Sequence, residues 1–146
     1  MAEDGYGVRT LPDLYREWAA SGMIANIGGR IVDVSAGKLV LEGNLTTEAH
    51  SFPTSRGPIV HGGAIATLAD EALATVAYTV AEEGQTTVTA DLKVDFLRPA
   101  LPGRLVARAT VRHRTRRLAF TEVTVEQGDT GQVVAEARAV IAYVKT

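Results

Sequence analysis

The chain has 146 residues, of which 46% are hydrophobic, with no cysteine and a formal net charge of -2. This length and apolar content fit one domain with a substantial core, and the lack of cysteine excludes disulfides, thiol nucleophiles and thiolate metal sites. The small net charge gives no overall attraction to nucleic acid or anionic membrane, and neither a signal-peptide pattern nor a membrane-spanning apolar run is found. We therefore expect a cytoplasmic protein.

Residues 1–27 are interpreted as an N-terminal segment. Residues 1–9 are polar, contain glycine and are expected to be mobile. Behind Pro12, with Gly22 as a stop, apolar side chains recur at helical spacing: Leu11, Leu14, Tyr15, Trp18 and Ala19. This pattern predicts a short amphipathic helix that packs on the domain, and a lid over a pocket is the alternative.

Two strand-like runs follow, at residues 30–34 and 38–45. The link Ser35-Ala36-Gly37 has the length and composition of a tight hairpin turn. Residues 46–60 contain too many breakers for regular structure, so we expect a long loop there. These breakers are Ser51, Pro53, Gly57 and Pro58.

Residues 61–78, HGGAIATLADEALATVAY, are nearly all apolar and carry two adjacent acids. No proline interrupts them, so we expect a helix that begins near Gly62 and Gly63. The unpaired N–H groups at its start, together with the helix dipole, can hold a developing oxyanion. Because the helix is apolar almost all round, a sheet should cover one side, and a second protomer is the simplest cover for the other.

Four strand-like runs complete the chain, at residues 87–98, 104–113, 118–126 and 133–144. The first alternates cleanly. Its apolar face holds Val88, Ala90, Leu92, Val94 and Phe96, and its polar face holds Thr89, Asp91, Lys93 and Asp95. The order of a hairpin, one long helix and four strands predicts an α+β domain over residues 28–146, with an antiparallel sheet against the helix.

The motifs HGGAIATLADEA and DLKVDFLRPALPGRL resemble those of the hotdog-fold acyl-CoA thioesterases of the phenylacetate-pathway (PaaI-like) and 4-hydroxybenzoyl-CoA thioesterase type. The resemblance covers about residues 28–144. It implies a hotdog fold, in which a curved antiparallel sheet wraps one long central helix, and dimers that pair sheet edges and usually assemble into homotetramers. It also implies hydrolysis of an acyl-CoA to free acid and coenzyme A, with no metal or organic cofactor.

The resemblance further implies roles for single residues at the helix start. Gly62 would donate its backbone N–H to the thioester carbonyl, with His61 as its neighbour and Gly63 contributing to substrate binding. Relatives often carry an asparagine six residues before the histidine, and this position is Ser55 here. Ser55, or another residue of 46–60, is therefore expected to substitute for that asparagine.

By the same resemblance, Asp70 is the catalytic carboxylate, and Thr89 matches a position where relatives place a serine or threonine that helps to hold the water. A carboxylate shielded from bulk water can act as a general base or a nucleophile, and an apolar surrounding would raise the pKa of Asp70 from about 3.9 toward a useful range. The residues leave base and nucleophile open. Glu71 points about 100° around the helix and is expected to be structural or solvent-facing.

Helix geometry constrains how these groups meet. Eight residues place Asp70 about 12 Å along the axis from Gly62, so one helix cannot bring both to one carbonyl. We therefore expect two composite sites per twofold dimer, each with His61 and Gly62 from one chain and Asp70 and Thr89 from the other.

A basic run lies at the bend between two predicted strands and contains Arg112, His113, Arg114, Arg116 and Arg117. It is either ordinary soluble surface or a positive patch that binds the phosphates of coenzyme A through Arg112, Arg114, Arg116 and Arg117. No aromatic residues are interleaved with it, which disfavours nucleic acid.

Two other functions remain open at this point. One is a hotdog hydratase or dehydratase that acts on an enoyl or 3-hydroxyacyl thioester, and the other is an acyl-CoA-binding module without turnover. A metal site is not expected, because His50, His61 and His113 lack paired ligand spacing. The acyl group, aromatic or of short to medium chain length, cannot be read from the sequence.

Overall fold

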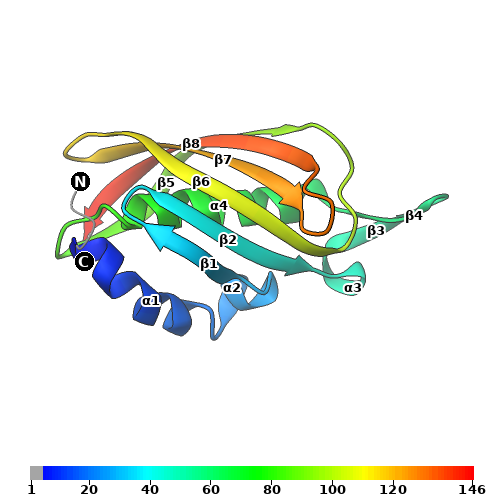
Figure 1. The fold of residues 1–146 in the computed structure, drawn as a ribbon, viewed down its shortest axis with the longest axis horizontal. Coiled ribbons are helices and arrows are strands. Elements are labelled where there is room, and N and C mark those ends of the chain that lie inside the picture. The colour runs from blue at the N-terminus through cyan, green and yellow to red at the C-terminus, as the bar shows by residue number, and fades with distance from the viewer. Residues whose placement is uncertain (1–4) are drawn as a thin grey trace.

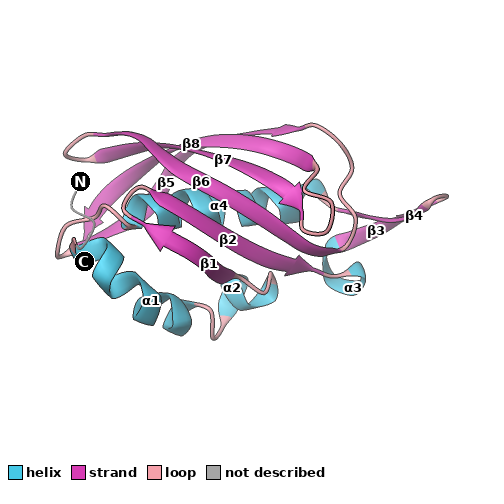
Figure 2. Cartoon of the chain, viewed as in Figure 1, coloured by secondary structure: helices cyan, strands magenta, loops and turns pink. Residues whose placement is uncertain are grey.

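The computed structural model describes residues 5–146. Six strands form one antiparallel sheet in the order β1-β2-β6-β7-β8-β5, which curves around the long helix α4 (Figures 1 and 2). The strands are β1 (Arg30–Ser35), β2 (Lys38–Leu45), β5 (Gln85–Phe96), β6 (Gly103–Arg114), β7 (Leu118–Gln127) and β8 (Val133–Lys145). The helices are α1 (Tyr6–Trp18), α2 (Gly22–Asn26), α3 (Thr47–His50) and α4 (Gly62–Tyr78). The α+β hotdog architecture is confirmed.

The core lies between α4 and the inner face of the sheet. On α4 the buried stripe combines small side chains such as Ala69 and Ala72 with larger ones such as Leu68 and Leu73, and all four are fully buried. The fully buried side chains of this layer include Ala69, Ala72, Val76, Leu41, Leu105, Val125 and Ile141. Tyr143 also donates its hydroxyl hydrogen to the carbonyl of Ala77 at 2.7 Å, near the C-terminal end of α4. The sheet thereby fixes the position and direction of α4.

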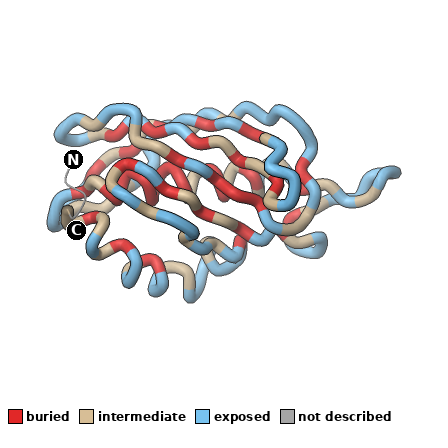
Figure 3. The backbone as a smooth tube through the Cα atoms, in the orientation of Figure 1, coloured by how far each residue is buried: buried red, intermediate tan, exposed pale blue. Residues whose placement is uncertain are grey.

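The prediction of an irregular loop at residues 46–60 is wrong. After α3, the chain forms a two-stranded hairpin of β3 (Ser51–Thr54) and β4 (Gly57–Val60). Pro53 and Pro58 stand directly opposite each other, one pair in from the hydrogen-bonded pair that closes the two-residue turn. Antiparallel pairs alternate in hydrogen bonding, so neither proline removes a ladder bond. The hairpin projects from the body of the molecule and is largely exposed (Figure 3).

The N-terminal helix is longer than predicted. It begins at Tyr6, so residues 6–9 of the expected mobile segment are helical and Gly5 is the extended N-cap, whereas residues 1–4 lie outside the described residues. Pro12 lies inside the helix rather than before it. Tyr15 is buried, and the Trp18 ring meets the Tyr78 ring edge-on at 5.5 Å between centroids. The interpretation of this helix as a packing element is therefore supported, and it covers part of α4.

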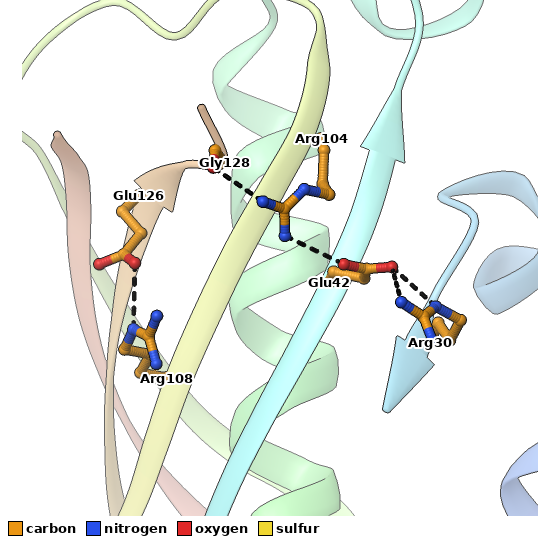
Figure 4. Close-up of polar contacts among 6 residues, drawn as sticks. All are labelled: Arg30, Glu42, Arg104, Arg108, Glu126 and Gly128. Atoms are coloured by element: carbon orange, nitrogen blue, oxygen red, sulfur yellow. Dashed lines mark hydrogen bonds and ion pairs between the residues drawn. The ribbon is translucent and has the colours of Figure 1, made fainter. Parts of the chain in front are cut away.

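The outer face of the sheet carries cross-strand ion pairs (Figure 4). Glu42 on β2 pairs with Arg30 at 2.6 Å and with Arg104 at 3.2 Å, and Arg108 pairs with Glu126 at 3.0 Å. Burial raises the pKa of Glu42, but the hydrogen bonds and charges of Arg30 and Arg104 outweigh it and lower that pKa overall. This face is polar, in contrast to the inner face on which α4 lies.

No helix within residues 5–146 is long and apolar enough to cross a membrane.

Candidate active site

The start of α4 is an open hydrogen-bond donor. His61 is the N-cap residue, and its Nδ1 accepts a hydrogen bond from the Gly63 N–H at 2.9 Å. The Gly62 N–H, by contrast, has no acceptor anywhere in residues 5–146. Gly62 thus offers its N–H to a ligand at the positive end of the helix dipole, whereas the Gly63 N–H is already used by His61.

Two aromatic rings flank this donor, and the sequence interpretation gave neither a role in the site. A Cβ atom added to Gly62 would lie 3.3 Å from the ring of Phe96 at the end of β5. The Phe52 ring of β3 stands edge-on to the imidazole of the neighbouring His61, 6.2 Å between centroids. Phe96 is 54% exposed and Phe52 is 42% exposed. Their exposure beside an unpaired donor is the signal that marks them as part of the site.

Asp70 and Thr89 are brought together as expected. The Thr89 hydroxyl on β5 donates a hydrogen bond at 2.7 Å to the Oδ1 of Asp70 on α4. Asp70 therefore lies on the side of α4 that faces β5. On the same side, the Thr87 hydroxyl donates to the carbonyl of Ala74 at 3.1 Å. In this single chain Asp70 is half-buried and Thr89 is exposed, so a substrate or a second protomer can reach both.

A β-bulge creates this contact. The pairing of β5 with β8 shifts between Thr89 and Asp91, which leaves Ala90 as an extra residue. Thr89 and Phe96 are seven positions apart and would lie on opposite faces of a regular strand, yet both contact α4. The predicted unbroken alternation is therefore wrong: Val88 points outward and is 45% exposed.

The structure does not bring Gly62 and Asp70 to one point within a chain. Both lie on the same regular helix, eight residues apart, which corresponds to about 12 Å along its axis. The arrangement therefore provides two candidate half-sites, an unpaired N–H donor beside His61 at the helix start and a carboxylate with Thr89 near the helix middle.

The basic run is divided by a second bulge. The register of β6 against β7 shifts between Val111 and His113, and this turns Arg114 inward. Its guanidinium lies 4.0 Å from the centre of the Tyr143 ring and donates to the Gln85 Oε1 at 2.9 Å. Arg114 is thus held by structural contacts, which weakens its assignment to phosphate binding.

The other arginines of the run remain on the surface. Arg112 pairs with Glu122 at 2.9 Å, and Arg116 and Arg117 are exposed at the β6–β7 turn. This turn lies near the C-terminal end of α4, because β8 binds both the Arg117 carbonyl and, through Tyr143, the end of that helix. Within one chain the run is therefore at the opposite end of α4 from Gly62.

Ser55 lies at the tip of the β3–β4 hairpin, where Thr54 and Gly57 close the turn. It is exposed, and the β3–β4 hairpin to which it belongs projects from the body of the molecule (Figure 1). Its predicted role as a substitute for the family asparagine stays a prediction, and within one chain the structure does not bring it to His61.

Glu71 is half-buried under α1 rather than solvent-facing. Burial raises its pKa, and the Thr75 hydroxyl donates a hydrogen bond to its Oε1 at 3.1 Å. Burial also raises the pKa of Tyr15 on α1, and the charge of Glu71 adds to that effect. Glu71 therefore belongs to the contact between α1 and α4 and not to the Asp70 side of the helix.

Comparison with known proteins agrees with this geometry. A family model described as the thioesterase superfamily matches residues 57–134, which include α4, β5, β6 and β7. Acyl-coenzyme A thioesterase 13 from Homo sapiens is 34% identical over 113 residues, which are 75% of this chain and 77% of that protein. The protein of the same name from Pongo abelii matches to the same extent.

Solved structures share the fold. A phenylacetic acid degradation-related protein from Ralstonia eutropha JMP134 superposes with a TM-score of 0.77 at 29% identity, over 90% of this chain and 97% of that one. The E. coli PaaI protein of the phenylacetic acid degradation operon has a TM-score of 0.77 at 22% identity, over 92% and 93% of the two chains. By the family match and its 34% identical relatives, this chain belongs to the thioesterase superfamily.

Proposed function

We propose that this protein hydrolyses acyl-CoA thioesters to free acid and coenzyme A. The open Gly62 N–H at the start of α4 is the observation that carries the proposal, because thioester hydrolysis needs a donor that polarises the carbonyl. Membership of the thioesterase superfamily and relatives named acyl-coenzyme A thioesterase support the same reaction. They favour hydrolysis over the hydratase and over binding without turnover.

In the proposed reaction the thioester oxygen accepts a hydrogen bond from the Gly62 N–H, and the helix dipole favours the charge that develops on it. The Asp70 carboxylate either takes a proton from the attacking water or attacks the carbon itself. The carbon–sulfur bond then breaks, and the coenzyme A thiolate leaves and takes up a proton. Where Asp70 has attacked the carbon, water then hydrolyses the mixed anhydride, which releases the free acid and restores the carboxylate. Thr89 holds one Asp70 oxygen and leaves the other for the chemistry.

We further propose that the two half-sites come from different protomers of a homodimer. The β5 strand pairs only with β8 among residues 5–146, so its second edge is open along 12 residues. Twofold pairing of this edge would place the Asp70 side of one α4 beside the partner helix in the opposite direction. It would also place the β6–β7 turn of one chain, which contains Arg116, near the start of α4 in the other chain. Assembly into a homotetramer and a cytoplasmic location complete the proposal.

The test is thiol release from a panel of aromatic, short-chain and medium-chain acyl-CoAs, with Asp70→Asn as the comparison. We expect turnover by the wild type and a loss of about 100-fold or more in the variant, as for a positioned acid–base group. A loss below about threefold would remove Asp70 from the mechanism. Hydration of an enoyl-CoA without thiol release would instead establish the hydratase alternative.

A further inference from the structure

His50 is buried, whereas the other two histidines of the chain, His61 and His113, are exposed. Both ring nitrogens of His50 have partners. Its Nδ1 lies 2.8 Å from the backbone N of Thr46, and its Nε2 lies 2.8 Å from the Oδ1 of Asn26. The ring therefore connects the end of α2 with the residue before α3, two elements that Figure 1 labels.

These contacts select one form of the ring. The Thr46 backbone N–H can only donate, so Nδ1 must be the acceptor. The ring proton then lies on Nε2, which donates it to the amide oxygen of Asn26. A second proton on Nδ1 would place two donors face to face. The contacts thus require a neutral imidazole with its proton on Nε2.

The backbone of the same residue reaches the candidate site. The His50 carbonyl accepts the N–H of His61 at 2.7 Å. His61 in turn caps α4 and takes the Gly63 N–H, which leaves the Gly62 N–H as the open donor. A short path of hydrogen bonds therefore runs from the Asn26 side chain, through His50, to the residue before Gly62.

The residues around the ring hold its backbone rigidly. Thr46 accepts the His50 N–H at its carbonyl at 3.1 Å and the Ala49 N–H at its hydroxyl at 3.0 Å. The Ser51 hydroxyl donates to the same Thr46 carbonyl at 2.9 Å. The His50–His61 pair continues the register of the β3–β4 ladder, which holds the carbonyl from one side, and since α3 has only four residues, these bonds and the ring of His50 hold it from the other.

We propose that His50 is a positioning residue for the Gly62 donor, an inference that rests on the proposed thioesterase function. It touches no reacting atom. Its neutral ring locks the α3 turn to α2, and its carbonyl sets the position of His61 and therefore of the Gly62 N–H. A misplaced oxyanion donor weakens binding of the transition state more than binding of the substrate.

Two variants separate the contacts of the ring. His50→Gln places an amide near Nε2 and keeps a donor for Asn26, but it loses the acceptor for the Thr46 N–H. His50→Asn places an oxygen near Nδ1 and keeps that acceptor, but it loses the bond to Asn26. Leu39→Ala is the control, because Leu39 is buried on β2 toward the C-terminal end of α4 and its truncation destabilises the fold without touching the path.

We expect each His50 variant to lower kcat on acyl-CoA by about tenfold or more while KM stays within about threefold. The backbone amide NMR signals of Gly62 and Gly63 should shift in both variants and not in Leu39→Ala. In the wild type, nitrogen NMR at neutral pH should show His50 neutral with its proton on Nε2. A doubly protonated ring, or a proton on Nδ1, would overturn the inference.

The inference would also be overturned if the His50 variants had a lowered melting temperature but unchanged kcat and unchanged amide NMR signals of Gly62 and Gly63. His50 would then contribute to stability alone. If the wild type releases no thiol from any acyl-CoA, the proposed function fails. The amide shifts and the protonation of His50 then decide, by themselves, whether this residue positions the helix start.

Discussion

The Thr89 hydroxyl donates a 2.7 Å hydrogen bond to the Asp70 carboxylate, and the extra residue at Ala90 is what allows Thr89 and Phe96 to face α4 together. A carboxylate oxygen that accepts such a bond is fixed in direction. The other oxygen accepts no hydrogen bond within residues 5–146. Because of the bulge, the single strand β5 supplies both Thr89 to the carboxylate half-site and the Phe96 ring beside Gly62.

The hydroxyl of Thr89 should contribute more to turnover than its methyl group. We expect Thr89→Val, which keeps the shape and loses the donor, to lower kcat by about tenfold or more, because a hydrogen bond to a charged group contributes about 1.5–3 kcal/mol. Thr89→Ser keeps the donor and should stay within about threefold of the wild type. Steady-state thiol release measures both. Equal activity of the two variants would show that the bond to Asp70 has no part in turnover.

Glu71 should affect stability and not turnover. Burial raises its pKa above the ordinary 4.5, so the folded protein keeps this proton to higher pH than the unfolded chain. The stability that this proton provides is present below pH 4.5 and is lost as the pH rises through the folded-state pKa. At pH 7 the unfolded chain gains more from ionising Glu71 than the folded protein does, so this carboxyl group lowers the stability.

Glu71→Gln removes that destabilising effect and can still accept the Thr75 hydrogen bond. We expect a higher melting temperature at pH 7, a gain that vanishes in acid, and kcat within about threefold of the wild type. Glu83→Gln, at an exposed turn position, is the matched control and should leave the melting temperature unchanged. If Glu71→Gln abolished turnover and Asp70→Asn did not, the catalytic carboxylate would be Glu71 and not Asp70.

The two exposed arginines of the basic run should act on the nucleotide end of the substrate. We expect replacement of Arg116 and Arg117 by serine to raise KM for acyl-CoA by about threefold or more, with less effect on kcat and on a truncated thioester that lacks the nucleotide. An equal loss on both substrates would point to a folding defect.

Arg114 should behave differently from these two, because it stacks on Tyr143 and binds Gln85. Arg114→Ser is expected to lower the melting temperature, which thermal unfolding measures directly. A raised KM for acyl-CoA with unchanged melting temperature would return Arg114 to the phosphate site.

Much of the fold could be predicted because its signals are local. The apolar run of α4 after Gly62 and Gly63, and the strands that follow it, were visible as periodicity, whereas the role of Asp70 was implied only by the family resemblance. The two bulges could not be read, since Val88 to Phe96 alternates in sequence as if the strand were regular. Pro53 and Pro58 led to the wrong prediction of an irregular loop. They are tolerated in strands because the register of the hairpin pairs them with each other, where neither removes a ladder hydrogen bond.

The site was predictable only in part for a similar reason. The free N–H of Gly62 follows from its place as the first residue of a helix, so the sequence was enough to indicate it. The rings of Phe96 and Phe52, and the inward turn of Arg114, depend on pairing between distant strands. No pattern along the chain specifies such pairing to the nearest residue.

Gly62→Pro removes the open donor with little change to the helix. Proline suits the first helical position, and His61 already has the extended backbone, φ -63° and ψ 135°, that a following proline requires. The added ring atoms meet the exposed Phe96 side chain, so Gly62→Ala, which adds a Cβ and keeps the N–H, is the control. We expect a loss of about 100-fold or more with proline and far less with alanine.

Mixing this variant with Asp70→Asn tests most directly whether Gly62 of one protomer and Asp70 of its partner act on the same thioester. After co-refolding of equal amounts, half of the dimers pair the two variants, and each has one intact site, so the mixture should regain up to about a quarter of wild-type thiol release while each parent stays inactive. A mixture that remains inactive, although subunit exchange between the two variants is demonstrated, would contradict the shared site.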